Sequence, residues 1–450
     1  MKRLALISSY AEECGAAFYS SRLKRHLEAA GFTVDVKRLP ISLLRVSFPA
    51  AVRRKGDAEI QRIARELPEY DAVLLQFEPG LYGTIPAASY RRVRYLLAAA
   101  KKAIITVHGF DRNVTTNESL MSLVWTGRYG AAIGRMLTQP DRAVVENFWK
   151  YVARSQHITV LTFCGADQTL LQRFHDIRRI ANFPITYFDQ GEVAAIKAAT
   201  DREQLMRQFG LDPRRKYFAV CGFLNPYKGH LTAIKALEYL PSDWDLAIVG
   251  GEHPHGIEAN LQIGPYVRQL LAFLLEGEQK GRDAGSASVL TNSALGDLIT
   301  RADLDRLDIK QDLFRKSEFK YFLPQSGLHD RVKFLGQVTD EMMPRFYAAL
   351  DYIVHPYIRT REGQSGSGPA TMALEFGTRS LFSNAPVFRE MSLYFADAMH
   401  FFNIGNFVEL AESLMRFDNF EKDLRANRER ALKTYNPAAM VGVYRDLLSA

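Results

Sequence analysis

The chain has 450 residues, of which 47% are hydrophobic and 24% are charged. These values are typical of a globular protein with enough chain for two domains. The three cysteines have no paired spacing, which argues against a disulfide framework or a zinc site. The net charge of +8 lies in the first part of the chain, since residues 1–190 carry 27 Lys and Arg against 17 Asp and Glu. This excess favours an anionic partner: lipid headgroups, a phosphate-bearing acceptor or nucleic acid.

The opening residues read as a first strand and not as a signal peptide, because the apolar run is short. No apolar run reaches the roughly 18 residues that a membrane-spanning helix needs. Together with the cysteine usage, this predicts a cytoplasmic protein. The basic excess adds an expected peripheral contact with the anionic inner face of the cytoplasmic membrane.

Strands and helices alternate along the first part of the sequence. Residues 4–9 form a continuous apolar strand of the kind found in sheets covered on both faces. A helix over 17–30 and a strand over 32–36 complete one β-α-β unit. The pattern continues with strands at 72–76, 103–107, 158–161 and 177–181, and with a helix at 90–100. This alternation predicts an open parallel sheet in a first domain over 1–190.

A second alternation follows a connecting segment at 185–199. Its strands are predicted at 217–221, 244–249, 332–334, 352–354 and 380–382, and its helices at 231–239 and 341–349. Residues 254–329 interrupt it as an insertion, with helical stretches at 266–279 and 303–319. The predicted fold class is α/β, with two Rossmann-like parallel-sheet domains (1–190 and 200–435) facing across a cleft. A last amphipathic helix at 437–450 is expected to pack back on the first domain.

A glycine-rich loop follows the strand at 352–354. Gly363, Gly366 and Gly368 precede Pro369, which suits a first helical position, and a helix is predicted over 370–376 with Gly377 as its left-handed cap. Free backbone N–H groups and the helix dipole make such a helix start suitable for an anion. Glycine also lets the backbone approach a phosphate closely.

Several segments in this order resemble the family 4 glycosyltransferases of the GT-B fold. They are CGAAFYSSRLKRHLEAAGFTVDV at residue 14, QFEPGLYG at 76, TVHGFD at 106, CGFLNPYKG at 221, LAIVGGEHP at 246, VKFLGQVTDEMMPRFYAALDYIVHPY at 332, and the glycine-rich loop. The resemblance implies a retaining hexosyltransferase whose second domain holds a nucleotide-diphosphate sugar. It also implies that the first domain holds the acceptor, expected to be a glycan or lipid-linked saccharide of the cell envelope.

The resemblance also suggests roles for individual residues. Lys228 is a compact cation suited to neutralising a donor diphosphate as the leaving group gains charge. His108, at the end of a first-domain strand, is placed beside the donor sugar. Gly15 is placed near the donor phosphates, and Glu78 on the acceptor side. The remaining predicted donor-binding residues are Gln364, Ser365, Gly366, Ser367, Gly368 and Glu375.

The sequence departs from the family pattern at two places. Phe223 stands where many members carry an arginine, so Lys228 works without that partner or Arg359 or Arg361 substitutes for it. The family's two glutamates, separated by seven residues, are also incomplete. If Gly377 is aligned with the glycine that closes that motif, Gln364 and Met372 occupy the glutamate positions. If Glu375 is taken as the second glutamate, Ser367 falls at the first.

Neither a paired-carboxylate loop nor a metal-ligand cluster is evident, so no metal cofactor is expected. The chain lacks a GxGxxG after a first strand, which argues against a dinucleotide oxidoreductase. No nucleic-acid-binding module is recognisable, so nucleic acid is not expected as a partner. A non-catalytic sugar-nucleotide-binding protein of the same fold stays open as an alternative, because an expected carboxylate is missing.

Overall fold

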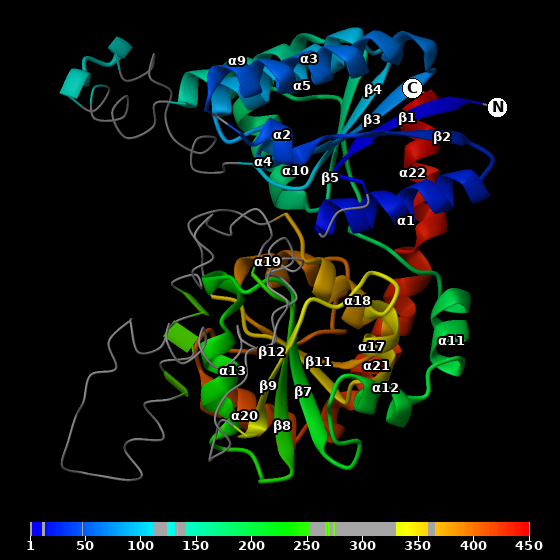
Figure 1. Ribbon diagram of the computed structural model, residues 1–450, viewed down its shortest axis with the longest axis vertical. Coiled ribbons are helices and arrows are strands. Elements are labelled where there is room, and N and C mark those ends of the chain that lie inside the picture. Colours follow the sequence, from blue (N-terminus) through cyan, green and yellow to red (C-terminus); the bar gives the residue numbers. More distant parts are fainter. Residues whose placement is uncertain are drawn as a thin grey trace. The chain divides into compact units, whose positions relative to one another are not determined.

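The computed structural model describes residues 2–10, 14–46, 48–110, 124–130, 133, 141–252, 266–267, 269–270, 273–274, 330–358 and 365–449. The chain divides into two compact units (Figure 1). The first unit comprises residues 1–187, 360–368 and 434–450, and the second comprises residues 188–359 and 369–433. Each unit is built on one six-stranded sheet.

The first unit contains a parallel sheet with the order β2-β1-β3-β4-β5-β6. Its strands are β1 (Arg3–Ser8), β2 (Thr33–Arg38), β3 (Ala72–Phe77), β4 (Ala103–Val107), β5 (Ile158–Thr162) and β6 (Ile180–Asn182). The strand order reverses between β1 and β3: β2 pairs with one edge of β1, and the later strands are added from β3 onward at the other edge. The predicted strands are present, although β6 begins three residues later than 177.

The helices of the first unit cover both faces of this sheet. They are α1 (Gly15–Ala29), α2 (Ile41–Leu44), α3 (Ala50–Glu66), the short η1 (Leu67–Glu69), α4 (Pro79–Tyr82), α5 (Pro86–Ala99), α9 (Arg142–Arg154), α10 (Gly165–His175) and α22 (Pro437–Ser449). In Figure 1, α3, α5 and α9 lie along one face, and α1 and α22 along the other. The last helix is joined to the unit through buried Tyr444, whose hydroxyl lies 2.8 Å from Thr106 Oγ1 and 3.3 Å from Tyr19 Oη.

The second unit repeats the same architecture with the order β12-β11-β10-β7-β8-β9. Its strands are β7 (Lys216–Cys221), β8 (Trp244–Val249), β9 (Val332–Gly336), β10 (Tyr352–His355), β11 (Arg379–Ser383) and β12 (His400–Phe402). All the neighbouring pairs run parallel. The order reverses between β7 and β10, which therefore end at the same edge of the sheet.

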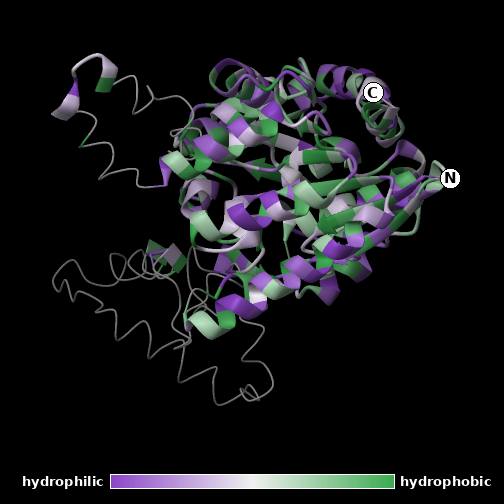
Figure 2. Cartoon of the chain, turned by 90° about the horizontal axis from the view of Figure 1, so that it is seen from above, coloured by the Kyte–Doolittle hydropathy of each residue, from purple (hydrophilic) through white to green (hydrophobic). Residues whose placement is uncertain are grey.

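Helices flank this second sheet as well. They are α11 (Gln190–Ala198), α12 (Arg202–Gln208), the short η2 (Pro226–Lys228), α13 (His230–Leu237), α17 (Met343–Ala349), α18 (Gly368–Phe376), α19 (Pro386–Met391), α20 (Phe407–Met415) and α21 (Asp418–Thr434). Gly377 follows α18 with a φ of 64°, which confirms the predicted left-handed cap. Figure 2 shows the hydrophobic strands inside and the hydrophilic residues mostly on the outer helices.

Part of the predicted insertion belongs to the core of the second unit. Val267, Leu270 and Leu274 are buried at 0–1% exposure and pack in the same cluster as Phe218 and Leu237. Their spacing is that of one apolar helix face. This stretch of the predicted insertion at 254–329 therefore contributes to the core of the second unit.

The segment over 185–199, which was expected to be an irregular connection, contains the helix α11. Its start is fixed by a capping box: Asp189 Oδ1 accepts from the Glu192 N–H at 2.8 Å, and the Glu192 carboxylate accepts from the Asp189 N–H at 3.3 Å. The Asp-x-x-Glu spacing is a recognisable signal for a helix start. Across the described ranges, no helix is both long enough and apolar enough to span a membrane.

Candidate functional site

The loops after β7 and β10 meet at the point where the strand order of the second sheet reverses. The Ile358 N–H donates to the Tyr227 carbonyl at 2.8 Å, which joins the two loops. Gly229 has a φ of +69°, and a Cβ on it would overlap the Pro356 carbonyl oxygen. Only glycine fits there, because the position combines left-handed backbone with direct contact to the facing loop. In open parallel sheets, ligands bind at such a reversal.

Lys228 is buried within these two loops, with 5% of its surface exposed. Its ammonium donates to the Tyr357 hydroxyl and lies 4.3 Å from the centre of the Tyr357 ring and 5.3 Å from that of Tyr227. No carboxylate in the described part of the chain forms an ion pair with it. Burying a charge without an opposite charge is costly. The site is therefore suited to an anionic ligand.

The groups around Lys228 add no negative charge. Burial, with a smaller contribution from the Lys228 ammonium, lowers the pKa of His230 to about 3. Burial and the same ammonium also hold the pKa of His355 well below its usual value. Burial raises the pKa of the Cys221 thiol to about 12, although Lys228 opposes this shift. All three side chains are consequently uncharged near neutral pH.

The start of α18 lies beside Lys228 in the same unit. Gly222, which follows β7 with a φ of +112°, is next to both: a Cβ on it would lie 3.0 Å from Lys228 Nζ and 3.6 Å from Pro369 Cγ. The predicted cation and the N-terminal end of the predicted helix are thus neighbours. The positive end of the α18 dipole and the Lys228 ammonium together favour an anion.

The predicted donor loop contacts other residues of the first unit. A Cβ on Gly366 would lie 2.7 Å from Ile185 Cδ1, and a Cβ on Gly368 would lie 2.6 Å from Tyr187 Oη. Close packing against these side chains is sufficient to require glycine. Ser365 and Ser367 are buried in the same loop. Gln364, Arg359 and Arg361 lie outside the described residues.

Glu375 lies at the other end of α18, seven residues after Gly368. At about 1.5 Å per residue, its Cα lies about 10 Å along the helix from the loop. Glu375 is buried and lines a cavity at the C-terminal end of the helix, and its backbone carbonyl accepts from Gln190 Nε2 at 3.4 Å. This placement separates Glu375 from the other predicted donor-binding residues.

In the first unit, His108 follows β4 and is held by its neighbours. Its Nε2 lies 2.7 Å from Gln76 Oε1, and its ring makes edge contacts with Tyr19 and Phe163 at 5.3 and 5.0 Å between centroids. Since Oε1 only accepts, Nε2 carries the proton and Nδ1 remains an acceptor. Although His108 keeps part of its surface exposed, its desolvated surroundings lower its pKa to about 3. It is neutral at pH 7 and is suited to hydrogen bonding.

Gly15 and Glu78 lie at the same edge of the first sheet, after β1 and β3. Gly15 is the first residue of α1, and a Cβ on it would meet nothing within 4 Å. The space over this helix start is open within the described structure. Glu78 has an exposed side chain, although the protein around its carboxyl raises the pKa and Arg45 partly offsets this. Burial is the main cause that raises the pKa of the Cys14 thiol, and the Glu78 carboxylate raises it as well.

Sequence reasoning missed Tyr357, the residue that holds Lys228. Its position two residues after the end of β10 was a usable signal, because residues that follow neighbouring parallel strands meet at one edge. The roles of Gly222 and Gly229 were also missed, since a steric contact between distant loops leaves no local pattern. In the part of the chain described, no cluster of His, Cys, Asp and Glu is arranged to hold a metal ion.

The sequence matches no protein-family model and no curated protein. Solved structures do match over the full chain. Sucrose-phosphate synthase from Thermosynechococcus elongatus has a TM-score of 0.62 at 16% identity, covering 100% of both chains. HepE from Anabaena in complex with UDP has a TM-score of 0.56 at 15% identity, also covering 100% of both.

WaaG, a glycosyltransferase involved in lipopolysaccharide biosynthesis, has a TM-score of 0.56 at 13% identity, covering 99% of this chain and 100% of that one. At such identities, the shared feature is the architecture. Two six-stranded parallel sheets with flanking helices, matched along the whole length of these structures, confirm that the chain has the GT-B fold.

Proposed function

We propose that the protein is a retaining glycosyltransferase of family 4, which transfers a sugar from a nucleotide-diphosphate sugar to an acceptor. The observation that carries the proposal is the buried Lys228 ammonium, which has no carboxylate partner among the described residues and lies beside the first turn of α18. A diphosphate supplies the missing negative charge. The position at the reversal of strand order supports a ligand there.

In the proposed reaction, the group that gains negative charge is the leaving diphosphate, which is bound at Lys228. The bond between the sugar's anomeric carbon and the diphosphate oxygen breaks, and the acceptor oxygen bonds to that carbon on the same face. The acceptor's proton passes to the leaving phosphate oxygen. Because the leaving diphosphate gains negative charge as the bond breaks, Lys228 and the N–H groups of α18 stabilise the transition state more than the bound donor.

UDP-sugars are the first donors to test, because HepE structures contain UDP, UDP-glucose, or UDP with glucose. Thermal unfolding is measured with UDP, GDP, dTDP and their sugars. A ligand at 100 times its Kd raises the free energy of unfolding by about 2.7 kcal/mol. Stabilisation by one nucleotide family identifies the base. No stabilisation by any of them contradicts the proposal.

A non-catalytic sugar-nucleotide-binding protein is the second candidate, because Met372 or Ser367 stands where the family has a glutamate. The two functions differ in turnover. A stabilising nucleotide sugar is incubated with the protein and a panel of saccharide acceptors, and release of the free nucleotide diphosphate is followed. Release that depends on the acceptor identifies the enzyme. Binding without release under every acceptor identifies the non-catalytic alternative.

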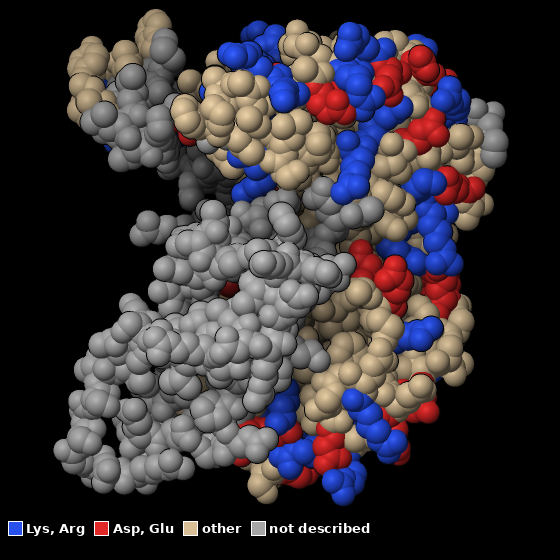
Figure 3. Space-filling view, viewed as in Figure 1, with Lys and Arg blue, Asp and Glu red and all other residues tan. Residues whose placement is uncertain are grey.

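The acceptor is proposed to be a glycan or lipid-linked saccharide of the cell envelope, bound by the first unit at an anionic membrane surface. Figure 3 shows Lys and Arg side chains on the visible face, interspersed with Asp and Glu. Among the basic residues of α3 and α5, Arg92 is buried in an ion pair with Asp57 at 2.7 Å and is unavailable. Arg54, Lys55 and Arg94 stay exposed on α3 and α5.

Each exposed basic residue near such a surface contributes about 1 kcal/mol at low salt. Exposed Phe48 and Tyr95 supply aromatic surface in the same unit. Co-sedimentation with vesicles of anionic or neutral lipid tests this contact. Pelleting that is specific to anionic vesicles and lost at high salt is expected. Equal pelleting with both kinds of vesicle contradicts the membrane contact.

A further inference from the structure

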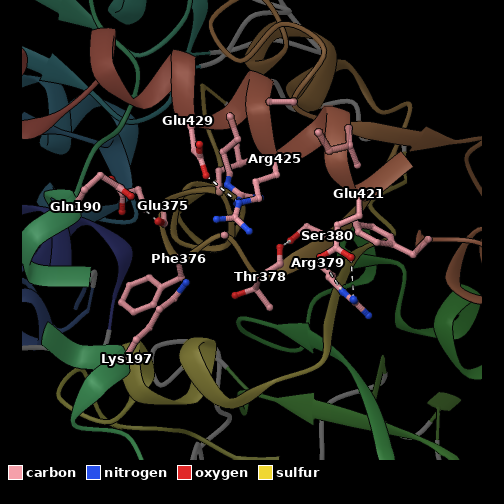
Figure 4. Close-up of a pocket in the computed structure, with 16 residues that line it drawn as sticks. Gln190, Lys197, Glu375, Phe376, Thr378, Arg379, Ser380, Glu421, Arg425 and Glu429 are labelled. Atoms are coloured by element: carbon pink, nitrogen blue, oxygen red, sulfur yellow. Dashed lines mark hydrogen bonds and ion pairs between the residues drawn. The ribbon is translucent and has the colours of Figure 1, made fainter. Parts of the chain in front are cut away.

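A second polar cavity lies in the second unit, at the C-terminal end of α18. It has a volume of about 290 Å³ and is bounded by α11, α18, β11 and α21. Figure 4 shows Lys197, Glu375, Arg379, Arg425 and Glu429 around it. An adjoining cavity of about 280 Å³ shares Lys197 and the residues that follow α18. Neither cavity is lined by Lys228.

Two of the four basic side chains in this cavity are neutralised. Arg379 pairs with Glu421 at 2.7 Å and with Asp418 at 3.2 Å. Arg425 pairs with Glu429 at 2.9 Å. These contacts use two of the three lining carboxylates, and the third belongs to Glu375.

The other two cations, Lys197 and Arg428, form no ion pair or hydrogen bond with any residue in the described ranges. Arg428 is half-buried, and its guanidinium lies over Gly377, where a Cβ would be 2.6 Å from Nη2. A guanidinium has five N–H donors, so this one has its full donor capacity available. Lys197 reaches the same cavity from the last turn of α11.

The two cations also repel each other. Lys197 keeps much of its surface exposed, yet partial burial and the guanidinium groups of Arg428 and Arg425 lower its pKa. Burial likewise lowers the pKa of Arg428 and Arg425 adds to that effect, whereas the Glu429 and Glu421 carboxylates oppose it. One simpler explanation is that Arg428 only offsets the dipole at the C-terminal end of α18. That explanation does not account for the N–H donors of Arg428 or for the presence of Lys197 in the same cavity.

We propose that this cavity binds a small phosphate monoester, with its phosphate between Lys197 and Arg428. A dianion in that place removes their repulsion, and the planar guanidinium fork matches phosphate oxygens in pairs. Glu375 and Gln190 line the same cavity and are suited to hydroxyl groups on the ester, because a carboxylate accepts and an amide both accepts and donates. The ligand class is therefore a phosphate monoester that carries hydroxyl groups.

This site is distinct from the one at Lys228. The two lie at opposite ends of α18, whose nine residues span about 12 Å. The proposal stands on the cavity's own side chains and does not require the proposed transferase activity. A test must nevertheless separate the two sites, because phosphate is also attracted to Lys228.

The test measures thermal unfolding against increasing glycerol 3-phosphate or inorganic phosphate at constant ionic strength, with sodium chloride and glycerol as blanks. The variants are Lys197→Gln, Arg428→Gln, Lys228→Met and, as a matched control, Lys422→Gln, an exposed lysine of α21 outside the cavity. Since hydrogen bonds to charged groups contribute about 1.5–3 kcal/mol, each cavity variant should weaken the apparent affinity for glycerol 3-phosphate at least tenfold.

The Lys422→Gln variant should keep the wild-type response to glycerol 3-phosphate, and Lys228→Met should keep the part of that response that Lys197→Gln removes. The proposal is overturned if the wild-type protein shows no saturable shift beyond the blanks. It is also overturned if Lys197→Gln keeps the full wild-type shift, whether or not Lys228→Met abolishes it. Because Lys197 is largely exposed, its variant is expected to fold even if Arg428→Gln does not.

Discussion

Replacing Lys228 by methionine should separate a ligand-binding role from a structural one. The substitution keeps the length of the side chain but removes a charge that is 95% buried without a carboxylate partner in the described structure. A hydrophobic residue in place of a buried charge is neutral or stabilising, so the free energy of unfolding without ligand should stay constant or rise by about 1 kcal/mol. The cost should appear only when an anion binds.

The magnitude follows from the contacts that a diphosphate would lose. A charged hydrogen bond contributes about 1.5–3 kcal/mol, so the Kd for UDP should rise roughly tenfold to a hundredfold. At a UDP concentration of 100 times the wild-type Kd, stabilisation should then fall from about 2.7 to about 1.4 kcal/mol or less. Turnover should fall by about two to three orders of magnitude, as when one transition-state donor is lost. Uridine binding should change far less.

The assay is thermal and chemical unfolding with and without UDP, followed by turnover with the active donor. Lys216→Met is the matched control, because Lys216 is an exposed lysine near an aromatic ring at the opposite end of β7. If Lys228→Met unfolds more easily without ligand and keeps the full response to UDP, Lys228 is a structural residue and the reasoning is refuted.

Other perturbations test the remaining features. Gly229→Ala should destabilise the protein by about 3 kcal/mol or more because the new Cβ overlaps the facing loop. Gly15→Ala should leave the melting temperature unchanged, because a Cβ there meets nothing within 4 Å. It should raise the donor KM if phosphates approach that helix start. His230 and His355 are neutral in the folded protein and bind protons only when it unfolds, so the free energy of unfolding is highest above pH 6.5 and falls below that pH. In denaturant titrations, the free energy of unfolding of the second unit should fall by about 3 kcal/mol between pH 7.5 and 5.5. A flat pH profile contradicts this prediction. EDTA should leave turnover unchanged if Lys228 and the start of α18 supply the positive charge that stabilises the leaving diphosphate. Activity that is lost in EDTA and restored by magnesium would show that a metal ion supplies this charge. A Gly/Ser linker in place of residues 277–328 should give a folded protein, whereas replacing all of 254–329 should expose its core and reduce solubility.

The sequence was sufficient to predict the two parallel sheets except for the edge strand β12, because most buried strands are nearly continuous apolar runs. The strands at 72–76 and 103–107 fall within β3 and β4, and the cap at Gly377 was also predictable. The helix α3 was missed, since it carries a strongly charged surface with only Gly56, Ile60, Ile63 and Ala64 buried. A narrow apolar stripe among many charges gives a weak periodic signal.

The candidate site was predictable only as a set of loops. Lys228 and the start of α18 were expected at one sheet edge because both follow strands of the same sheet, and the contacts at Gly222 agree with that expectation. The contact with Tyr357 depends on how two loops 129 residues apart pack together, which no local pattern encodes. For the same reason, the sequence could not show that Gly366 packs against Ile185, so Gly366→Val would test packing as well as phosphate binding.

The position of α22 has a consequence for the order in which the protein is made. The first unit draws its last helix from residues 437–449, and the Lys2 ammonium donates to the Leu448 carbonyl at 2.9 Å. Tyr444 fills a buried place beside β4 that nothing earlier in the chain occupies in the described fold. At about 5–20 residues per second, a ribosome needs roughly 12–50 s to travel from the end of the first sheet to this helix. During that time the apolar face that α22 covers is exposed, which favours aggregation of the nascent first unit until α22 is made.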